Sequence, residues 1–300
     1  MSSILKNVVA VKQSVGDVSI IGHLTWYSLS EMLITRDELK KKMVEAGLGE
    51  GFMPHEIRLP DAFRRATSKK FRHRISEAVV ENYLFREVAS DNRMIQRNIV
   101  CEVVDQKGRR LAYDGAAATL VLDKTSAKVT VSAISRLAEE LARDAVTKFE
   151  IYRHNYGTNT IRSVIMSILK SMAPTPVRPS GGVYFVPARH TDRLEAMLRF
   201  VKLLDHGEGE KVPLIDTTDM RNLITRKLLD HLRETLRACE EGVSNQLPKG
   251  QMKEILEHAR QVAQDYVQYK AIITGDLKEM EELVAGIREK VSAALINMAV

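Results

Sequence analysis

Cysteine is scarce in this chain of 300 residues: the only two, Cys101 and Cys239, lie far apart. Their scarcity excludes a disulfide-stapled fold and a cysteine-based metal site, and both thiols are expected to be reduced and buried. The eight histidines show no metal-ligand spacing. The phosphate-binding loop Gly-x4-Gly-Lys-Ser/Thr and the nucleophile elbow Gly-x-Ser-x-Gly are both absent. We therefore expect no cofactor, and the sequence favours a protein that is not an enzyme.

Long apolar runs are also missing, although 44% of the residues are hydrophobic. No run approaches the roughly 20 apolar residues that a membrane helix needs. Residues 1–17 lack the compact apolar core and the small-residue cleavage site of a signal peptide. The sequence therefore predicts a globular cytoplasmic protein with no membrane partner.

Positive charge is in excess, and it is unevenly distributed. The formal net charge is +6, from 45 Lys and Arg against 39 Asp and Glu. From Asp219 to the end there are 12 basic and 13 acidic residues, which leaves 33 basic and 26 acidic residues before that point. A positive field of this kind favours polyanionic partners, and it belongs to the first two thirds of the chain.

The pattern of apolar and turn residues predicts an α+β fold in three consecutive parts. Residues 1–132 are expected to form a mostly antiparallel domain, with a strand at 17–28, a helix opened by the capping box Thr35–Glu38 and closed near Gly47, and a meander of four or five strands within 81–132. Residues 133–218 are expected to form a small α/β region, with helices near 134–152, 160–172 and 191–204 and a strand at 212–215 that allows a βαβ unit.

Residues 219–300 read as helical throughout, with apolar residues three and four positions apart. The pattern is interrupted at Pro248-Lys249-Gly250 and shows one irregular step at Gly275. This predicts a C-terminal hairpin of long helices or a coiled coil. Folding back within one chain and dimerisation through the apolar seam both fit the pattern.

The strongest candidate for binding is the basic segment 61–75, "DAFRRATSKKFRHRI". It carries six Lys and Arg residues with no acid among them, and as a helix it would place Arg65, Lys69 and Arg72 on one face. Such a cluster can neutralise several phosphates of DNA or RNA. A solvated basic face, or salt bridges to acids elsewhere, would explain the same residues. The six are Arg64, Arg65, Lys69, Lys70, Arg72 and Arg74.

A second unusual stretch is "VRPSGGVYFVP", residues 177–187. Two adjacent glycines can adopt positive φ, which predicts a tight hairpin turn. Arg178 and Tyr184 would then lie on the face away from the core, as secondary nucleic-acid contacts, with Tyr184 stacking on a base. Ser180 has no base at a recognisable spacing. A winged-helix interpretation, in which helix 160–172 reads DNA, conflicts with the apolar character of that helix.

Two other functions remain open at this stage. The carboxylates of Asp61 and Asp105, together with Lys107, resemble the two carboxylates and the lysine of a metal-dependent nuclease site. Residues 105–108, however, are predicted to form the tip of a hairpin. Alternatively, the C-terminal helices act as a protein-interaction or assembly module, through self-association or a protein partner.

Four motifs make the chain resemble an uncharacterised (domain-of-unknown-function) protein family of phages and bacterial and archaeal mobile elements: "LITRDELKKKMVEAGL", "LPDAFRRATS", "RNIVCEVVD" and "VRPSGGVYFVP". They span roughly residues 17–205. The resemblance brings no established activity and no catalytic residue. It implies a phage or plasmid setting in the cytoplasm of a host cell, and it favours nucleic-acid handling or interference with host machinery. The leading hypothesis is therefore a non-enzymatic binding protein that contacts nucleic acid through the basic segment.

Overall fold

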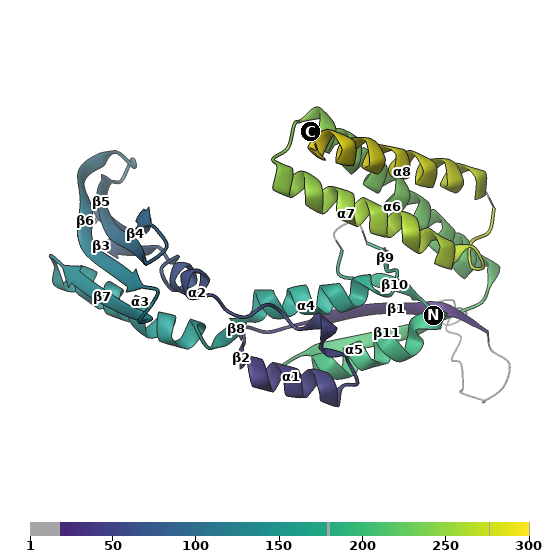
Figure 1. The fold of residues 1–300 in the computed structure, drawn as a ribbon, viewed down its shortest axis with the longest axis horizontal. Helices are drawn as coiled ribbons and strands as arrows, with labels where there is room; N and C mark the ends of the chain where they lie inside the picture. Colours follow the sequence, from purple (N-terminus) through teal and green to yellow (C-terminus); the bar gives the residue numbers. More distant parts are fainter. Residues whose placement is uncertain (1–18, 179–180, 276, 300) are drawn as a thin grey trace, which may run out of the picture. The chain divides into compact units, whose positions relative to one another are not determined.

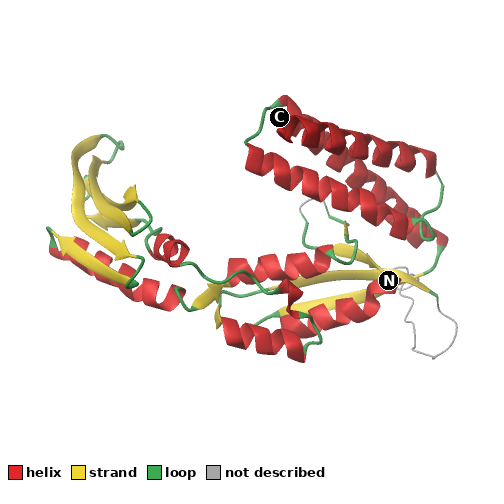
Figure 2. Cartoon of the chain, in the orientation of Figure 1, coloured by secondary structure: helices red, strands yellow, loops and turns green. Residues whose placement is uncertain are grey.

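The computed structural model describes residues 19–178, 181–275 and 277–299, and it confirms the α+β fold class (Figures 1 and 2). Residues 1–17, which lack the features of a signal peptide, and Ser180 lie outside the described residues. The chain divides into two compact units. The discontinuous unit comprises Met1–Ser28 and Met166–Val300, and the inserted unit comprises Leu29–Ile165. Helix α4 (Thr158–Lys170) contains the division between them.

The discontinuous unit is built on a four-stranded sheet whose central strand comes from the start of the described chain. Strand β1 (Ile20–Ser28) pairs antiparallel with β10 (Tyr184–Pro187) on one side and with β11 (Glu208–Ile215) on the other. The short β9 (Thr175–Pro176) lies at the edge beside β10. Helix α5 (Thr191–Leu203) connects β10 to β11, so the expected strand–helix–strand unit is present with β1 inserted between its strands.

The described residues of the C-terminal part form three long helices, where the sequence predicts a two-helix hairpin. They are α6 (Thr218–Ser244), α7 (Lys249–Asp265) and α8 (Leu277–Ala299), with a 3-10 turn, η4 (Tyr266–Tyr269), after α7. The break before α7 at Pro248 was expected. A second break occurs at Gly275, which adopts a φ of 91° and precedes α8. The apolar seam residues are buried within this bundle, including Leu232, Cys239 and Ile287. The hairpin prediction is therefore wrong in the number of helices.

The inserted unit is organised around a curled five-stranded antiparallel sheet in the order β3-β4-β5-β6-β7 (Figure 1). Its strands are β3 (Phe71–Arg74), β4 (Val79–Ser90), β5 (Met94–Asp105), β6 (Arg110–Asp123) and β7 (Lys128–Ala133). Helices α2 (Leu59–Ala66) and α3 (Arg136–Tyr152) pack their buried side chains onto one face of this sheet. The predicted meander in residues 81–132 is thus confirmed.

The remaining elements of the inserted unit precede the large sheet or follow it in the sequence. Strand β2 (Leu33–Thr35) pairs antiparallel with β8 (Asn155–Gly157). Thr35 and Glu38 form the predicted capping box at the start of α1 (Arg36–Glu45), and a 3-10 turn, η2 (Glu50–Phe52), follows. Within this unit, the Arg162 side chain donates a hydrogen bond to the carbonyl of Leu29 at 3.2 Å, so the two ends of the inserted segment lie close together.

The two compact units differ from the three consecutive parts that the sequence indicated. The physical reason is the pairing of β1 with strands that follow it by more than 150 residues, which no local pattern reveals. None of the helices in the described part of the chain combines the length and the hydropathy that crossing a bilayer requires.

Candidate nucleic-acid interface

The basic side chains of segment 61–75 are exposed, but the segment does not form one helix. Helix α2 ends at Ala66, where the hydroxyl of Thr67 donates a hydrogen bond to the Phe63 carbonyl at 2.6 Å. The chain then continues into strand β3, so Arg72 and Arg74 lie on a strand. The prediction that Arg65, Lys69 and Arg72 share a helical face is therefore wrong. The six basic residues are all exposed, and they are distributed over different surroundings.

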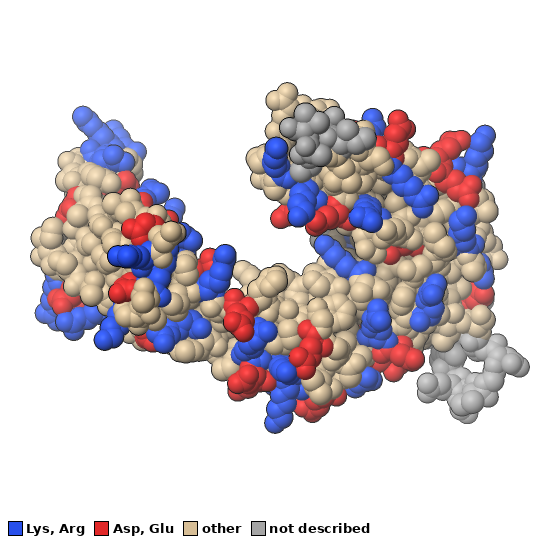
Figure 3. Space-filling view, in the orientation of Figure 1, with Lys and Arg blue, Asp and Glu red and all other residues tan. Residues whose placement is uncertain are grey.

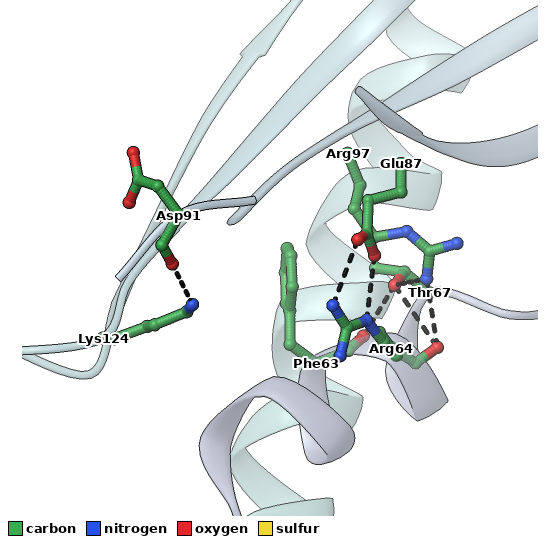
Figure 4. Close-up of polar contacts among 7 residues, drawn as sticks. All are labelled: Phe63, Arg64, Thr67, Glu87, Asp91, Arg97 and Lys124. Atoms are coloured by element: carbon green, nitrogen blue, oxygen red, sulfur yellow. Dashed lines mark hydrogen bonds and ion pairs between the residues drawn. The ribbon is translucent and has the colours of Figure 1, made fainter. Parts of the chain in front are cut away.

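Arg64 is engaged in the packing of α2 against the sheet. Its guanidinium donates two hydrogen bonds to the carboxylate of Glu87 on β4, at 2.9 and 3.0 Å (Figure 4). The hydrogen bonds from Arg64 hold the pKa of the Glu87 carboxyl below its usual range. From β5, Arg97 donates to the hydroxyl of Thr67 at 2.6 Å and to the Arg64 carbonyl at 3.2 Å. A phosphate at Arg64 would have to displace an existing ion pair.

Arg65 connects α2 to the C-terminal end of α3. Its guanidinium carbon lies 3.9 Å from the centroid of the Tyr152 ring, and its Nη1 donates to the Asn155 carbonyl at 3.2 Å. The guanidinium of Arg65 also packs directly against Gly157, where a Cβ would lie only 2.2 Å from Nη2 of Arg65. These contacts give Arg65 a structural role.

Arg65→Ala is expected to lower the free energy of unfolding of the inserted unit by about 1–2 kcal/mol, since a cation–π contact and a hydrogen bond are lost. Urea denaturation followed by circular dichroism measures the change. Lys70, which is exposed and has no hydrogen-bond or ion-pair partner among the described residues, supplies the control, and Lys70→Ala should stay within about 0.5 kcal/mol of the wild type. An Arg65→Ala protein of unchanged stability would contradict the structural role.

Lys69 faces a different environment from the two arginines of β3. It lines a cavity of about 400 Å³ between β3, β4 and α3, together with Phe71, Tyr83 and Lys148. This cavity lies on the helix-covered side of the sheet. Phe71 and Tyr83 are register partners on that side, with ring centroids 6.4 Å apart.

Arg72 and Arg74 project from the opposite face of the sheet, because side chains alternate along a strand. They line a cavity of about 560 Å³ that also contains Glu77, Asp105 and Gln106. The guanidinium of Arg74 donates to the carbonyls of Ser76 and Glu77, at 3.3 and 3.5 Å. The structure therefore brings the end of the basic segment beside the turn between β5 and β6.

That turn and the first residue of β6 carry three further cations. Gly108 adopts a φ of 77°, and the Asp105 carboxylate accepts hydrogen bonds from the backbone N–H groups of Lys107 and Arg109, at 2.9 and 2.8 Å. Lys107, Arg109 and Arg110 are exposed. Figure 3 shows Lys and Arg side chains gathered at the end of the sheet where β5 and β6 meet. We call this group the basic tip; it consists of Arg72, Arg74, Lys107, Arg109 and Arg110.

One cation of the basic tip is partly neutralised, and an aromatic ring lies beside it. Arg110 makes an ion pair with Glu102 at 3.0 Å, and its guanidinium carbon lies 5.2 Å from the centroid of the Tyr113 ring. Tyr113 is 54% exposed. The surface thus combines cations with an accessible ring. The sequence signal for this surface is the pair Arg109-Arg110 directly after the turn glycine, Gly108.

The three residues of the nuclease hypothesis have separate roles. Asp61 lies in the first turn of α2 and pairs with Arg58 at 2.7 Å. Asp105 holds the β5–β6 turn through backbone hydrogen bonds, and Lys107 belongs to the basic tip. Among the described residues, no cluster of three or more His, Cys, Asp or Glu side chains could hold a metal ion.

Arg178 and Tyr184 belong to the discontinuous unit, where β9 and β10 form the expected hairpin. Gly181 and Gly182 have φ values of 72° and 84°, and the Val177 N–H donates to the Val183 carbonyl at 3.0 Å. The connection is therefore longer than the two-residue turn expected. Arg178 and Tyr184 both line a cavity against α6 and α7. The helix of the winged-helix interpretation, α4, buries Ile161 and Leu169, as its apolar pattern indicated.

Together, these features define an α+β protein with a curled antiparallel sheet that ends in a basic tip, and with a C-terminal set of helices. The chain belongs to a family of unknown function, DUF6744, whose model matches residues 20–300. No curated protein and no solved structure matches the chain.

Proposed function

We propose that this protein binds nucleic acid, without catalysis, through the basic tip. The observation that carries the proposal is the convergence of two segments of the sequence. Arg72 and Arg74 on β3 line one cavity with residues of the β5–β6 turn, which itself presents Lys107 and Arg109 to solvent. Cations that gather on one exposed end of a sheet match the electrostatic footprint of a phosphate-binding surface.

The local charge balance supports the same proposal. Lys107 and Arg109 have no ion-pair partner among the described residues, and the Asp105 carboxylate beside them is occupied by backbone N–H groups. Arg110 shares its charge with Glu102 and lies beside Tyr113. Cations release condensed counterions when they meet phosphates, and an exposed ring can stack on an unpaired base. Arg64 and Arg65 contribute positive potential, but their contacts within the unit make them secondary.

We also propose that this is a phage or mobile-element protein and that it acts in the cytoplasm of the host cell. The four motifs that span roughly residues 17–205 support the setting, and the low cysteine content supports the compartment. The alternative of an assembly module that acts through the C-terminal helices finds less support, because the apolar seam it would use packs within the bundle.

The experiment is a salt series of binding to labelled single-stranded DNA, duplex DNA and RNA. The variant Arg72→Ala/Arg74→Ala/Lys107→Ala/Arg109→Ala is expected to bind on the order of 100-fold more weakly at about 0.05 M salt. The slope of log affinity against log salt should also fall by about 3–4, since four cations are removed and each lost phosphate contact removes nearly one unit.

The matched control removes the same kind of charge elsewhere on the inserted unit. Arg136 and Arg143 lie on α3 and are paired with Glu140 and Glu139 at 3.0 and 2.6 Å. The variant Arg136→Ala/Arg143→Ala should bind like the wild type. The double variant Arg72→Ala/Arg74→Ala removes the same number of charges from the basic tip. If it and the control lose the same affinity, the effect is one of charge in general and not of the basic tip. The proposal is also refuted if the wild type does not bind at low salt.

A further inference from the structure

The discontinuous unit contains a cavity that the proposed nucleic-acid surface does not use. It measures about 420 Å³ and lies between the β9–β10 hairpin and helices α6 and α7. Its size falls within the range of small-molecule sites. The residues that matter for its chemistry are Arg178, Tyr184, Lys227, His231, Glu234 and His258.

The hairpin determines where Arg178 and Tyr184 lie. Gly181 and Gly182 at positive φ let the chain reverse between β9 and β10. A Cβ built at Gly181 would lie 3.6 Å from the hydroxyl of Tyr184, so this hydroxyl lies directly beside the turn. Tyr184 is half-buried on β10, whereas Arg178 is exposed at the rim and has no ion-pair partner among the described residues.

Two imidazoles form the wall on the helical side. The rings of His231 on α6 and His258 on α7 have centroids 5.7 Å apart at an interplanar angle of 57°. Burial lowers the pKa of His231 to about 4 and also lowers that of His258. At neutral pH both rings are therefore uncharged, and each offers one hydrogen-bond donor and one acceptor.

The charged groups of the cavity have both signs. Lys227 lies 3.9 Å from Asp230, so its charge is partly balanced, whereas Arg178 is unbalanced at the opening. Glu234 lies close enough to His258 to favour its protonated form slightly. Asp230 and Glu234 would repel a small inorganic anion, and Arg178 and Lys227 would repel a cation. An apolar ligand would remove water from all four charged groups without replacing its hydrogen bonds.

We infer that this cavity binds a 5′-nucleotide unit, either a free nucleotide or one unpaired residue of a strand. A nucleotide has the three properties that the walls require. Its phosphate can pair with Arg178, its planar base can stack on Tyr184, and the amino or ring N–H groups of the base can donate to Glu234 or to an imidazole acceptor. The inference stands on the discontinuous unit alone and does not depend on the basic tip.

The test is calorimetric titration of the full chain with AMP, GMP, CMP and UMP, and with an oligonucleotide of eight thymidines. Arg178→Ala and Tyr184→Ala should each weaken binding at least 10-fold, and Tyr184→Phe should retain it, because the ring provides the stacking. Arg189→Ala removes an exposed arginine outside the cavity and should bind like the wild type.

The outcomes separate the two sources of the ligand and the two proposals. Binding of a mononucleotide that responds to Arg178→Ala indicates a free nucleotide, and binding of the oligonucleotide alone with the same response indicates a strand residue. The basic-tip variant should retain nucleotide binding in this cavity. No binding of any of these probes at millimolar concentration, or binding that Arg178→Ala and Tyr184→Ala leave unchanged in folded protein, would overturn the inference.

Discussion

Replacing Gly22 with alanine is expected to destabilise the discontinuous unit by about 3 kcal/mol. Gly22 lies in the central strand β1, opposite Pro187 of β10 and Leu214 of β11. A Cβ there would lie 2.3 Å from the Val186 carbonyl oxygen and 2.5 Å from the Phe185 ring. Phe185 is fully buried, so neither neighbour can move without disturbing the core. Overpacking of this kind typically costs about 1–3 kcal/mol, and contact with backbone in a central strand places this case at the upper end.

The matched control is Gly250→Ala. Gly250 lies near the start of α7 in the same unit, and a Cβ there would meet nothing within 4 Å. Alanine is a better helix former than glycine, so the control should be neutral or gain up to about 1 kcal/mol. Urea unfolding followed by the fluorescence of Trp26, the only tryptophan, reports on this unit because Trp26 lies on β1. A Gly22→Ala protein as stable as the control would refute the close packing described for β1.

Phe149→Ala is expected to lower the stability of the inserted unit by about 3–5 kcal/mol. Phe149 on α3 is fully buried and meets Phe63 of α2 edge to face, with ring centroids 5.8 Å apart at 87°. Truncation leaves a cavity among helices and sheet and removes the aromatic pair. The measurement is urea unfolding followed by circular dichroism. Ile151→Ala, two residues further along α3 and 41% exposed, should cost less than about 1 kcal/mol.

The two large substitutions also test the division into two units. Gly22→Ala should shift the transition seen by Trp26, whereas Phe149→Ala should shift the circular dichroism transition and leave the Trp26 transition nearly unchanged. Equal shifts of both signals by both variants would show that the two units unfold as one.

The local parts of the fold could be predicted because their signals are local. The capping box of Thr35 and Glu38 marks the start of α1, and polar turns separate the strands of the meander. The partners of β1 could not be predicted, because nothing in its nine residues says which distant strands flank it. The irregular step at Gly275 was visible in the sequence, but only its φ of 91° shows that a new helix begins there.

The candidate site was predictable in composition but not in geometry. The run from Arg64 to Arg74 identified the cations, yet its charge pattern gave no sign that the helix ends at Ala66. The hydroxyls of Thr67 and Ser68 bond back to the carbonyls of the last turn. Along β3, Phe71 and His73 then alternate with Arg72 and Arg74, as a strand requires. The basic tip depends on register between β3, β4 and β5. The cavity beside Tyr184 depends on residues of α6 and α7, from Lys227 onward, that follow Tyr184 by more than 40 residues.

The position of β1 between two later strands has a consequence for folding during synthesis. The ribosome adds roughly 5–20 residues per second, so β1 waits about 8–30 s before Tyr184, the first residue of β10, has been made. During that interval the whole of Leu29–Ile165 is completed, and its two ends are within hydrogen-bonding distance through Arg162 and Leu29. The inserted unit can therefore fold while β1, with both edges unpaired, remains available to chaperones or to other nascent chains.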